Sequence, residues 1–292
     1  MSISRKRILG TLVATTGILA AVAYPAHAGG DSEARQDGDP SATYVWENDG
    51  DADPERADFY WDNDLAEAVA CEEVETHPLL NDGNRVYPGV TWKWYYDDSG
   101  RPESVSKDAV LSTLTASFQA IHDLRNNCGI TGDLSVDFSY DGERDSEQFT
   151  SEGTAYEINV SFADLAGDTV GNGGTDGAEW GTENDVQFVR ARGHVTLDSD
   201  TNWMTPGSPG CPENFRDDED LQKTDMQSTA MHEIMHALNV DHAEDDGTPE
   251  ADDTDNPKAY QTMASATATC TVFERTLGRG DVATLVDLYG TD

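Results

Sequence analysis

Basic residues are scarce in this chain of 292 residues, which has 18 Lys and Arg against 57 Asp and Glu and a formal net charge of −39. Such an acidic protein would repel phosphate groups, so electrostatic binding to nucleic acid or to an anionic membrane is excluded. The acidic groups of the protein also repel one another, and salt at 1 M screens this repulsion within about 3 Å. Because the acidic residues are spread along the chain, we interpret the composition as adaptation to a salty medium. A large surface for a cationic partner is the alternative.

Long apolar runs are also lacking, since no stretch after residue 28 is long and apolar enough to cross a bilayer. The first 28 residues carry the basic stretch Arg5–Arg7, the uncharged run Ile8–Ala23 and the small-x-small ending Ala26–Ala28, which together are typical of a secretory signal peptide. The start resembles a twin-arginine export signal in which Lys6 replaces the second arginine, and an ordinary basic start is the alternative. We therefore predict a secreted, extracellular protein with a signal peptide at residues 1–28.

Cysteine is limited to four residues, and none of them has CxxC spacing. A thiolate zinc site or a redox motif is therefore not expected, whereas an even number of cysteines in an exported protein suggests disulfides. Four cysteines allow three pairings. We favour Cys71–Cys128 and Cys211–Cys270, because each of these bonds closes one contiguous block of the chain.

The mature chain divides into an acidic N-terminal extension, residues 29–87, which could be a removed pro-segment, and one domain, residues 88–292. The predicted strands are residues 90–96, 134–140, 156–162 and 188–197, and the predicted helices are residues 105–124, 225–240 and 281–289. Residues 168–184 are rich in Gly, Asp, Asn and Thr and predict a loop. Strands followed by helices indicate an α+β domain around a mixed sheet.

The strongest motif is HExxH in the predicted helix 225–240, formed by His232, Glu233 and His236. Residues i and i+4 are about 40° apart around a helix, so both imidazoles project from one face and can bind one metal ion. Glu233 beside them can take a proton from a metal-bound water. His242 can supply a third nitrogen once the chain turns. Three protein ligands plus a water is the pattern of a catalytic zinc site, whereas a structural site has four protein ligands.

These residues resemble the metzincin metalloproteases, whose motif HExxHxxGxxH is followed by a methionine-containing turn. The resemblance implies an α+β, zincin/metzincin-type catalytic domain, in which a mixed twisted sheet carries an active-site helix and a C-terminal helix. It implies that His232, His236 and His242 are the zinc ligands and that Glu233 is the general base. Met263, in the stretch YQTMAS, matches the methionine turn.

One position departs from the family motif, because Asn239 stands where the family usually has glycine. That glycine lets the backbone turn sharply towards the third ligand. Asn is the non-glycine residue that best tolerates a left-handed conformation, so we still expect the turn to form.

Two further stretches are similar to the matrixin branch of this family. Ala191–Trp203 resembles the branch's edge strand, which binds extended substrate by backbone pairing, and Gly278–Gly290 resembles its final helix. His194 lies on the first stretch, where it could face solvent or act as a ligand of a second metal.

The resemblance implies a secreted, monomeric zinc endopeptidase, adapted to high salt, that hydrolyses polypeptide substrates with a zinc-bound water and Glu233 as general base. The alternative is a non-catalytic secreted metal-binding or cell-surface interaction protein on the same fold. Acidic residues in Glu244–Asp255 and Asp168–Asp176 offer oxygen ligands for Ca²⁺, or are solvated loops on an acidic surface.

Overall fold

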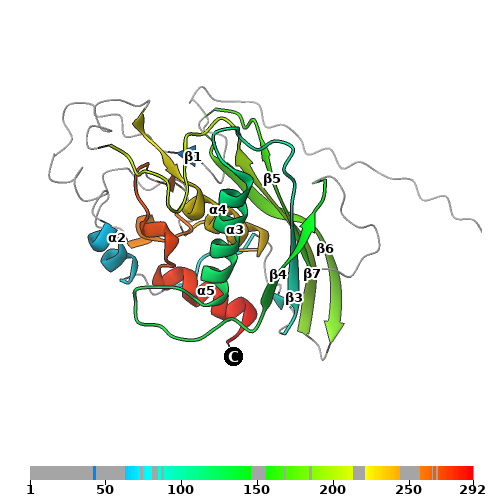
Figure 1. The fold of residues 1–292 in the computed structure, drawn as a ribbon. Helices are drawn as coiled ribbons and strands as arrows, with labels where there is room; N and C mark the ends of the chain where they lie inside the picture. The colour runs from blue at the N-terminus through cyan, green and yellow to red at the C-terminus, as the bar shows by residue number, and fades with distance from the viewer. Residues whose placement is uncertain are drawn as a thin grey trace, which may run out of the picture. The chain divides into compact units, whose positions relative to one another are not determined.

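A mixed six-stranded β-sheet forms the frame of the fold (Figure 1). The computed structural model describes residues 42–43, 63–72, 75–80, 85–86, 89–145, 156–167, 169–183, 186–212, 221–243, 257–264, 266–267 and 269–291. The strands of the main sheet are β2 (Arg85–Val86), β3 (Thr91–Tyr96), β4 (Asp137–Glu143), β5 (Glu157–Ala163), β6 (Gly171–Glu183) and β7 (Val186–Asp198). The predicted signal peptide, residues 1–28, lies outside the described residues.

The sheet is parallel except for β6. Strands β4, β3, β5 and β7 are neighbours in that order, and β2 also pairs with β7 in parallel. Strand β6 runs antiparallel to β7 from Gly171 opposite Leu197 to Glu183 opposite Val186. Two short sheets are separate, β1 (Ala42–Thr43) with β10 (Ala266–Thr267) and β8 (Trp203–Met204) with β9 (Thr224–Asp225).

Two predictions about the residues of β6 and β7 are wrong. Residues 168–184 are not a loop, because most of them form β6. The stretch Ala191–Trp203 is not an edge strand, because the residues of β7 within it pair with β5 on one side and with β6 on the other. Backbone pairing with β7 along the length of β6 outweighs the low strand propensity of its glycines.

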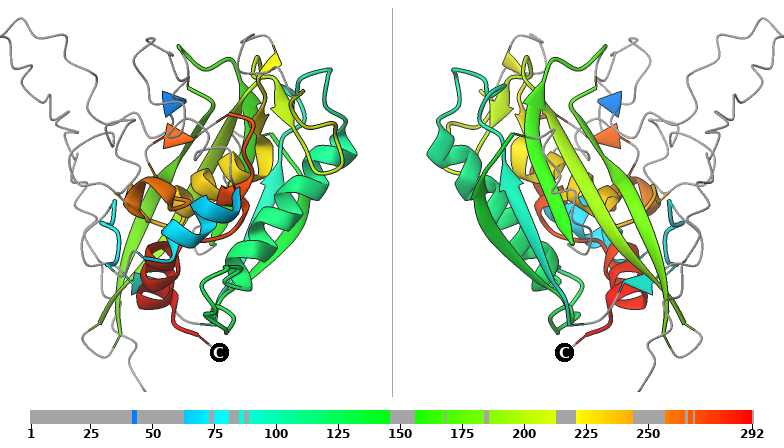
Figure 2. Two further views of the ribbon diagram at one scale, coloured as in Figure 1. Left: turned by 90° about the vertical axis from the view of Figure 1, so that its left-hand side faces the viewer. Right: turned by 90° about the vertical axis from the view of Figure 1, so that its right-hand side faces the viewer.

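Four helices accompany the sheet: α2 (Asn63–Ala70), α3 (Lys107–His122), α4 (Met226–Ala237) and α5 (Arg279–Tyr289). There are also two 3₁₀ helices, η3 (Pro257–Tyr260) and η4 (Phe273–Arg275). Figure 2 shows α3, α4 and α5 on one face of the sheet. The α+β class and the mixed sheet are therefore as predicted, and the three predicted helices each correspond to one of these elements.

The core lies between this face of the sheet and the helices. The apolar residues of α3 that recur at helical spacing, Val110, Leu114, Phe118 and Ile121, are all buried. They belong to one hydrophobic cluster with residues of β3, β5, β7, α4 and α5. A cluster that joins all of these elements fixes α4 against the sheet, and α4 carries the predicted metal ligands.

Two disulfides connect distant parts of the chain, Cys71–Cys128 and Cys211–Cys270, which confirms the favoured pairing. The first one attaches α2 to the segment after α3. Disulfides are common in extracellular proteins. Among the residues that the structure describes, no helix is long and apolar enough to cross a membrane.

The loop after β3 supplies a pH-dependent contact. Asp98 accepts hydrogen bonds from Arg101 Nε at 2.7 Å and from the hydroxyl of the buried Tyr96 at 3.0 Å. The bond from Arg101 is the main cause that lowers the pKa of the Asp98 carboxyl. A lowered pKa means that this carboxylate stabilises the fold above its ordinary pKa, and that the stabilisation is lost as the pH falls through the folded-state value.

We expect Asp98→Asn to lower the free energy of unfolding at pH 7 by about 1 kcal/mol, because a charged acceptor is lost from a partly exposed pair. Urea unfolding of both proteins at pH 7 and at pH 3 measures the effect, with the exposed Asp164→Asn as matched control. The difference between wild type and variant should shrink on acidification. A difference that stays constant or grows would contradict this account of Asp98.

Candidate metal centre

Helix α4 carries His232 and His236, and its start is held by a capping carboxylate. Asp225 accepts hydrogen bonds from the backbone N–H of Ser228 at 2.8 Å and from its hydroxyl at 2.9 Å. Arg275 Nε donates to the same Asp225 oxygen at 2.9 Å. Capping of this kind satisfies N–H groups that have no partner within the helix, so the buried helix begins at a defined residue.

The turn after α4 brings the third histidine back towards the helix. Asn239 has a φ of 76°, the left-handed conformation that was expected of it in place of glycine. The backbone N–H of Val240 then bonds to Met235 O at 3.0 Å, which folds the chain against the end of the helix. His242 follows directly, beside the face of α4 that carries the other two histidines.

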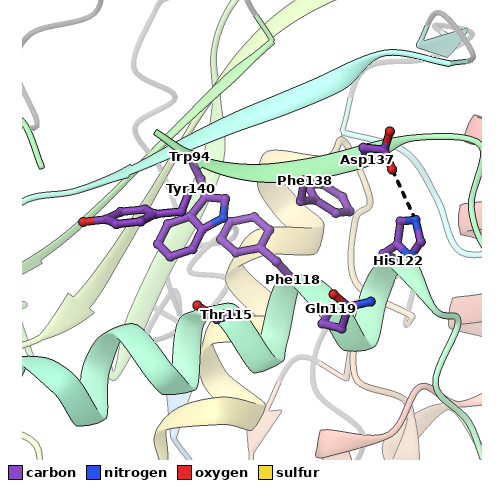
Figure 3. Close-up of a pocket in the computed structure, with 8 residues that line it drawn as sticks. All are labelled: Trp94, Thr115, Phe118, Gln119, His122, Asp137, Phe138 and Tyr140. Atoms are coloured by element: carbon purple, nitrogen blue, oxygen red, sulfur yellow. Dashed lines mark ion pairs between the residues drawn. The ribbon is translucent and has the colours of Figure 1, made fainter. Parts of the chain in front are cut away.

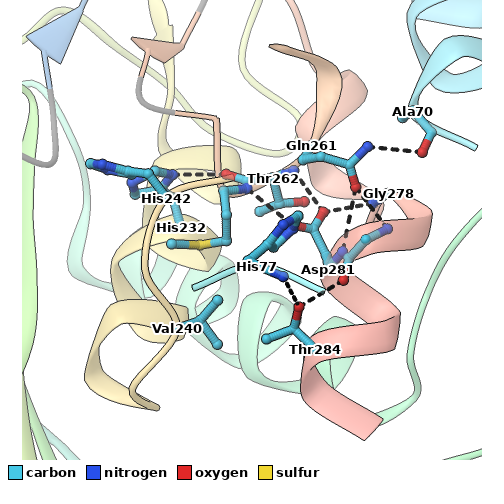
Figure 4. Close-up of polar contacts among 12 residues, drawn as sticks. Ala70, His77, His232, Val240, His242, Gln261, Thr262, Gly278, Asp281 and Thr284 are labelled. Atoms are coloured by element: carbon cyan, nitrogen blue, oxygen red, sulfur yellow. Dashed lines mark hydrogen bonds and ion pairs between the residues drawn. The ribbon is translucent and has the colours of Figure 1, made fainter. Parts of the chain in front are cut away.

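The three histidines form a group whose nitrogen atoms all lie within 4.8 Å of one another. His232 Nδ1 lies 2.7 Å from Thr262 O, and His236 Nδ1 lies 2.8 Å from Val240 O. Since a carbonyl oxygen only accepts, each Nδ1 must carry the proton, and each Nε2 presents a lone pair. Figure 4 shows His232 with its carbonyl partner and His242 beside it.

The donor set fits a metal ion such as zinc. His236 Nε2 and His242 Nε2 are 3.2 Å apart. Two nitrogen ligands at 2.0–2.1 Å from a tetrahedral zinc ion are about 3.3 Å apart. Hydrogen bonds from Nδ1 to carbonyl oxygens are also the usual way in which metal-binding histidines are oriented. These observations support a metal site and leave the identity of the metal open.

Met263, the residue matched to the methionine turn, is buried, and its backbone is hydrogen-bonded to the segment that carries the third histidine. Its carbonyl accepts from Ala243 N at 2.8 Å, directly after the third histidine. Its own N–H lies 3.2 Å from Asp281 Oδ1, and Thr262 N donates to Asp281 Oδ2 at 2.7 Å. The Asp281 carboxylate therefore holds the backbone whose Thr262 carbonyl orients His232.

Glu233 is fully buried and lies against β6. A Cβ added at Gly171 would lie 2.5 Å from Glu233 Oε1, and one added at Gly173 would lie 2.2 Å from the Glu233 carbonyl oxygen. Only glycine allows the strand to approach the helix so closely. The Glu233 carboxylate does not belong to the group of three histidine nitrogens that could hold a metal ion. At the level of the sequence, these two glycines were apparent only as members of a glycine-rich stretch.

The other predicted ligands do not join the histidine group. His194 Nε2 lies 2.9 Å from Asn172 Oδ1 on the neighbouring strand. The described residues of Asp168–Asp176 include no further group of metal-ligating side chains, and the Ca²⁺ stretch Glu244–Asp255 lies outside the described residues. A second group that the sequence did not suggest, His122 with Asp123 and Asp133, lies at the surface after α3.

A cavity of about 210 Å³ lies elsewhere, between α3 and β4 (Figure 3). It is lined by Trp94, Thr115, Phe118, Gln119, His122, Asp137, Phe138 and Tyr140. The Trp94 and Phe118 rings are stacked, with centroids 4.9 Å apart. This cavity contains no residue of the histidine group, so it is separate from the candidate metal centre.

No model of a known protein family matches the chain, and no curated protein matches it.

We expect the protein to bind one divalent metal ion at the histidine group, and Zn²⁺ is the ion used in the test. A free zinc concentration of about 100 times the Kd should raise the free energy of unfolding by about 2.7 kcal/mol. His236→Ala should lose most of this gain because it removes one of three ligands. Thermal unfolding with and without zinc measures the effect, and His122→Ala is the matched control. Equal stabilisation of His236→Ala and wild type would contradict the assignment, and its loss in His122→Ala would point to the surface group.

Proposed function

We propose that this chain is a secreted zinc endopeptidase of the metzincin type. The observation that carries the proposal is one helix that presents two imidazoles of the histidine group and, between them in the sequence, a buried carboxylate outside that group. A third histidine completes a set of three protein ligands, which leaves a coordination position for substrate or water. A purely structural zinc site has four protein ligands and gives Glu233 no task.

The metal proposed is zinc, because three neutral imidazoles in a compact group suit its borderline-soft character and its tetrahedral geometry. His232, His236 and His242 would hold it. When bound, zinc lowers the pKa of a water molecule towards neutrality and polarises the carbonyl group of a substrate.

Glu233 would then move the proton. Its carboxylate accepts a proton from the water molecule as the water oxygen adds to the carbonyl carbon of the scissile peptide bond. The same carboxylate delivers that proton to the peptide nitrogen, so that the C–N bond breaks and an amine leaves. Burial beneath β6 keeps the carboxylate in one position and away from bulk water.

Strand β6 is the proposed binding site for the substrate backbone. It is an antiparallel strand that passes over Glu233, and among the described strands it pairs only with β7. An extended peptide can add to such an edge by main-chain hydrogen bonds. The strand first expected in this role, Ala191–Trp203, has both of its edges occupied along β7. A polypeptide substrate is therefore proposed to lie along the outer edge of β6.

Glu233→Gln should lower the rate of hydrolysis by a factor of about 10² to 10⁴, because the proton acceptor is lost. Zinc affinity should stay within a few-fold of wild type, since Glu233 is not a ligand. The assay is cleavage of an unfolded protein in molar NaCl, with and without a chelator, and the exposed Glu103→Gln is the matched control.

The outcomes of this assay separate the two candidate functions. Hydrolysis that disappears in Glu233→Gln and in the chelated wild type, but not in Glu103→Gln, supports the peptidase. A folded, zinc-loaded wild type that cleaves nothing supports the non-catalytic metal-binding protein. Hydrolysis that survives in Glu233→Gln means that the chemistry lies at another residue.

Adaptation to high salt belongs to the same proposal. Because the net charge is −39, raising NaCl from 0.1 to 2 M should raise the thermal midpoint by at least about 5 °C through screening of repulsion. Differential scanning calorimetry measures the midpoint. Sucrose of equal osmolality is the control, because it stabilises by exclusion without screening charge. A midpoint that responds equally to sucrose and to NaCl would contradict the electrostatic explanation.

A further inference from the structure

Residues 75–80, here called the brace, contact the turn that carries the third histidine. Leu79 and Val240 form an antiparallel bridge. On either side of it, Leu80 N donates to Asn239 O at 3.2 Å and Asp241 N donates to Pro78 O at 3.0 Å. The left-handed turn before His242 is thus held by backbone pairing with a segment from near the start of the mature chain.

Through His77, the brace also contacts the residues that hold the backbone around Thr262. His77 is buried, and its Nε2 lies 2.8 Å from Asp281 Oδ1. Its backbone N–H donates to Thr284 Oγ1 at 2.7 Å. Asp281 in turn accepts from Thr262 N at 2.7 Å, and Thr262 O is the acceptor for His232 Nδ1 at 2.7 Å. Figure 4 shows this continuous series of contacts from His77 to His232.

A fully buried carboxylate needs its hydrogen-bond donors, because an unsatisfied buried charge is costly. Without the His77 donor, Asp281 Oδ1 would keep only the Met263 N–H at 3.2 Å, so rotation of the carboxylate or entry of water would lower the free energy. Either change displaces the Thr262 backbone that it holds, and with it the acceptor that orients His232. Loss of contacts that orient a ligand typically costs 10- to 100-fold in metal affinity.

Covalent and polar contacts keep the brace attached. The Cys71–Cys128 disulfide joins the end of α2 to the segment after α3, and Cys71 lies four residues before the first residue of the brace. The buried Gln261, next to Thr262, donates from Nε2 to Ala70 O at 2.9 Å. Residues 63–72 and 75–80 are therefore built into the same structure as the metal centre.

We propose that residues 63–80 are a permanent part of the metal centre and that His77 is a positioning residue for it. The inference rests on the proposed metal site, but it does not require the proposed peptidase activity. This proposal divides the predicted extension 29–87 into two parts. Because residues 63–80 stay with the metal centre, any removable pro-segment ends before Asn63.

The first test compares His77→Ala and His77→Gln with wild type and with the exposed Glu103→Gln as control, all in the full chain. Zinc affinity is measured by competition with a chromogenic chelator, and the visible spectrum of the Co²⁺-substituted protein reports ligand geometry. His77→Ala should weaken zinc binding about tenfold and change the Co²⁺ spectrum. His77→Gln, whose amide keeps an N–H donor, should recover most of both signals, and Glu103→Gln should match wild type.

Unchanged zinc affinity and an unchanged Co²⁺ spectrum in a folded His77→Ala protein overturn the proposal. Should His77→Ala fail to fold, Thr284→Val decides by the same two measurements, because it removes the acceptor of the His77 backbone N–H. Wild-type zinc affinity in Thr284→Val then overturns the proposal. A wild type that binds zinc but cleaves nothing contradicts the peptidase alone, whereas no zinc binding by wild type contradicts both proposals.

The second test is the mass of the secreted protein without reduction. The proposal expects the first residue to lie at or before Asn63, or a two-chain form in which residues 63–80 remain attached through Cys71–Cys128. A mature, metal-binding protein that lacks residues 63–80 contradicts the proposal.

Discussion

The candidate site depends on two hydrogen bonds, from Nδ1 of His232 to Thr262 O and from Nδ1 of His236 to Val240 O. They fix the tautomer of each imidazole and turn each Nε2 lone pair towards the other ligands. The structure around them serves to keep those two carbonyls in place. Asp281 holds the backbone at Thr262, and pairing with residues 75–80 holds the turn that contains Val240.

Close packing between α4 and β6 supplies the second constraint. Glycines at 171 and 173 let the strand contact the Glu233 side chain and backbone, so the carboxylate is buried on the helix that carries two of the three histidines and lies outside their group. The other edge of this strand is the proposed site for a substrate backbone. The acidic surface is a separate property, because the repulsion that it causes acts on the stability of the whole fold and is screened by salt.

Local features of the site and the two disulfide pairs were readable from the sequence, whereas the other contacts between distant residues were not. HExxH on one helix, the left-handed Asn239 and both disulfide pairs follow from spacing, conformational preference and chain continuity. The β6 prediction failed because glycine-rich composition indicates a loop, while the pairing partner of a strand is set by tertiary structure. The contact of His77 with Asp281 was missed because the two residues are 204 positions apart and no local pattern joins them.

The most direct test of the central claim is X-ray absorption at the zinc K edge of the zinc-loaded protein. A three-histidine centre with an open position predicts three imidazole nitrogens at about 2.0 Å and one further light ligand that exogenous anions can replace. A shell of four protein ligands that no anion displaces would make the site structural. A shell of oxygens without imidazole scattering would place the metal away from His232, His236 and His242 altogether.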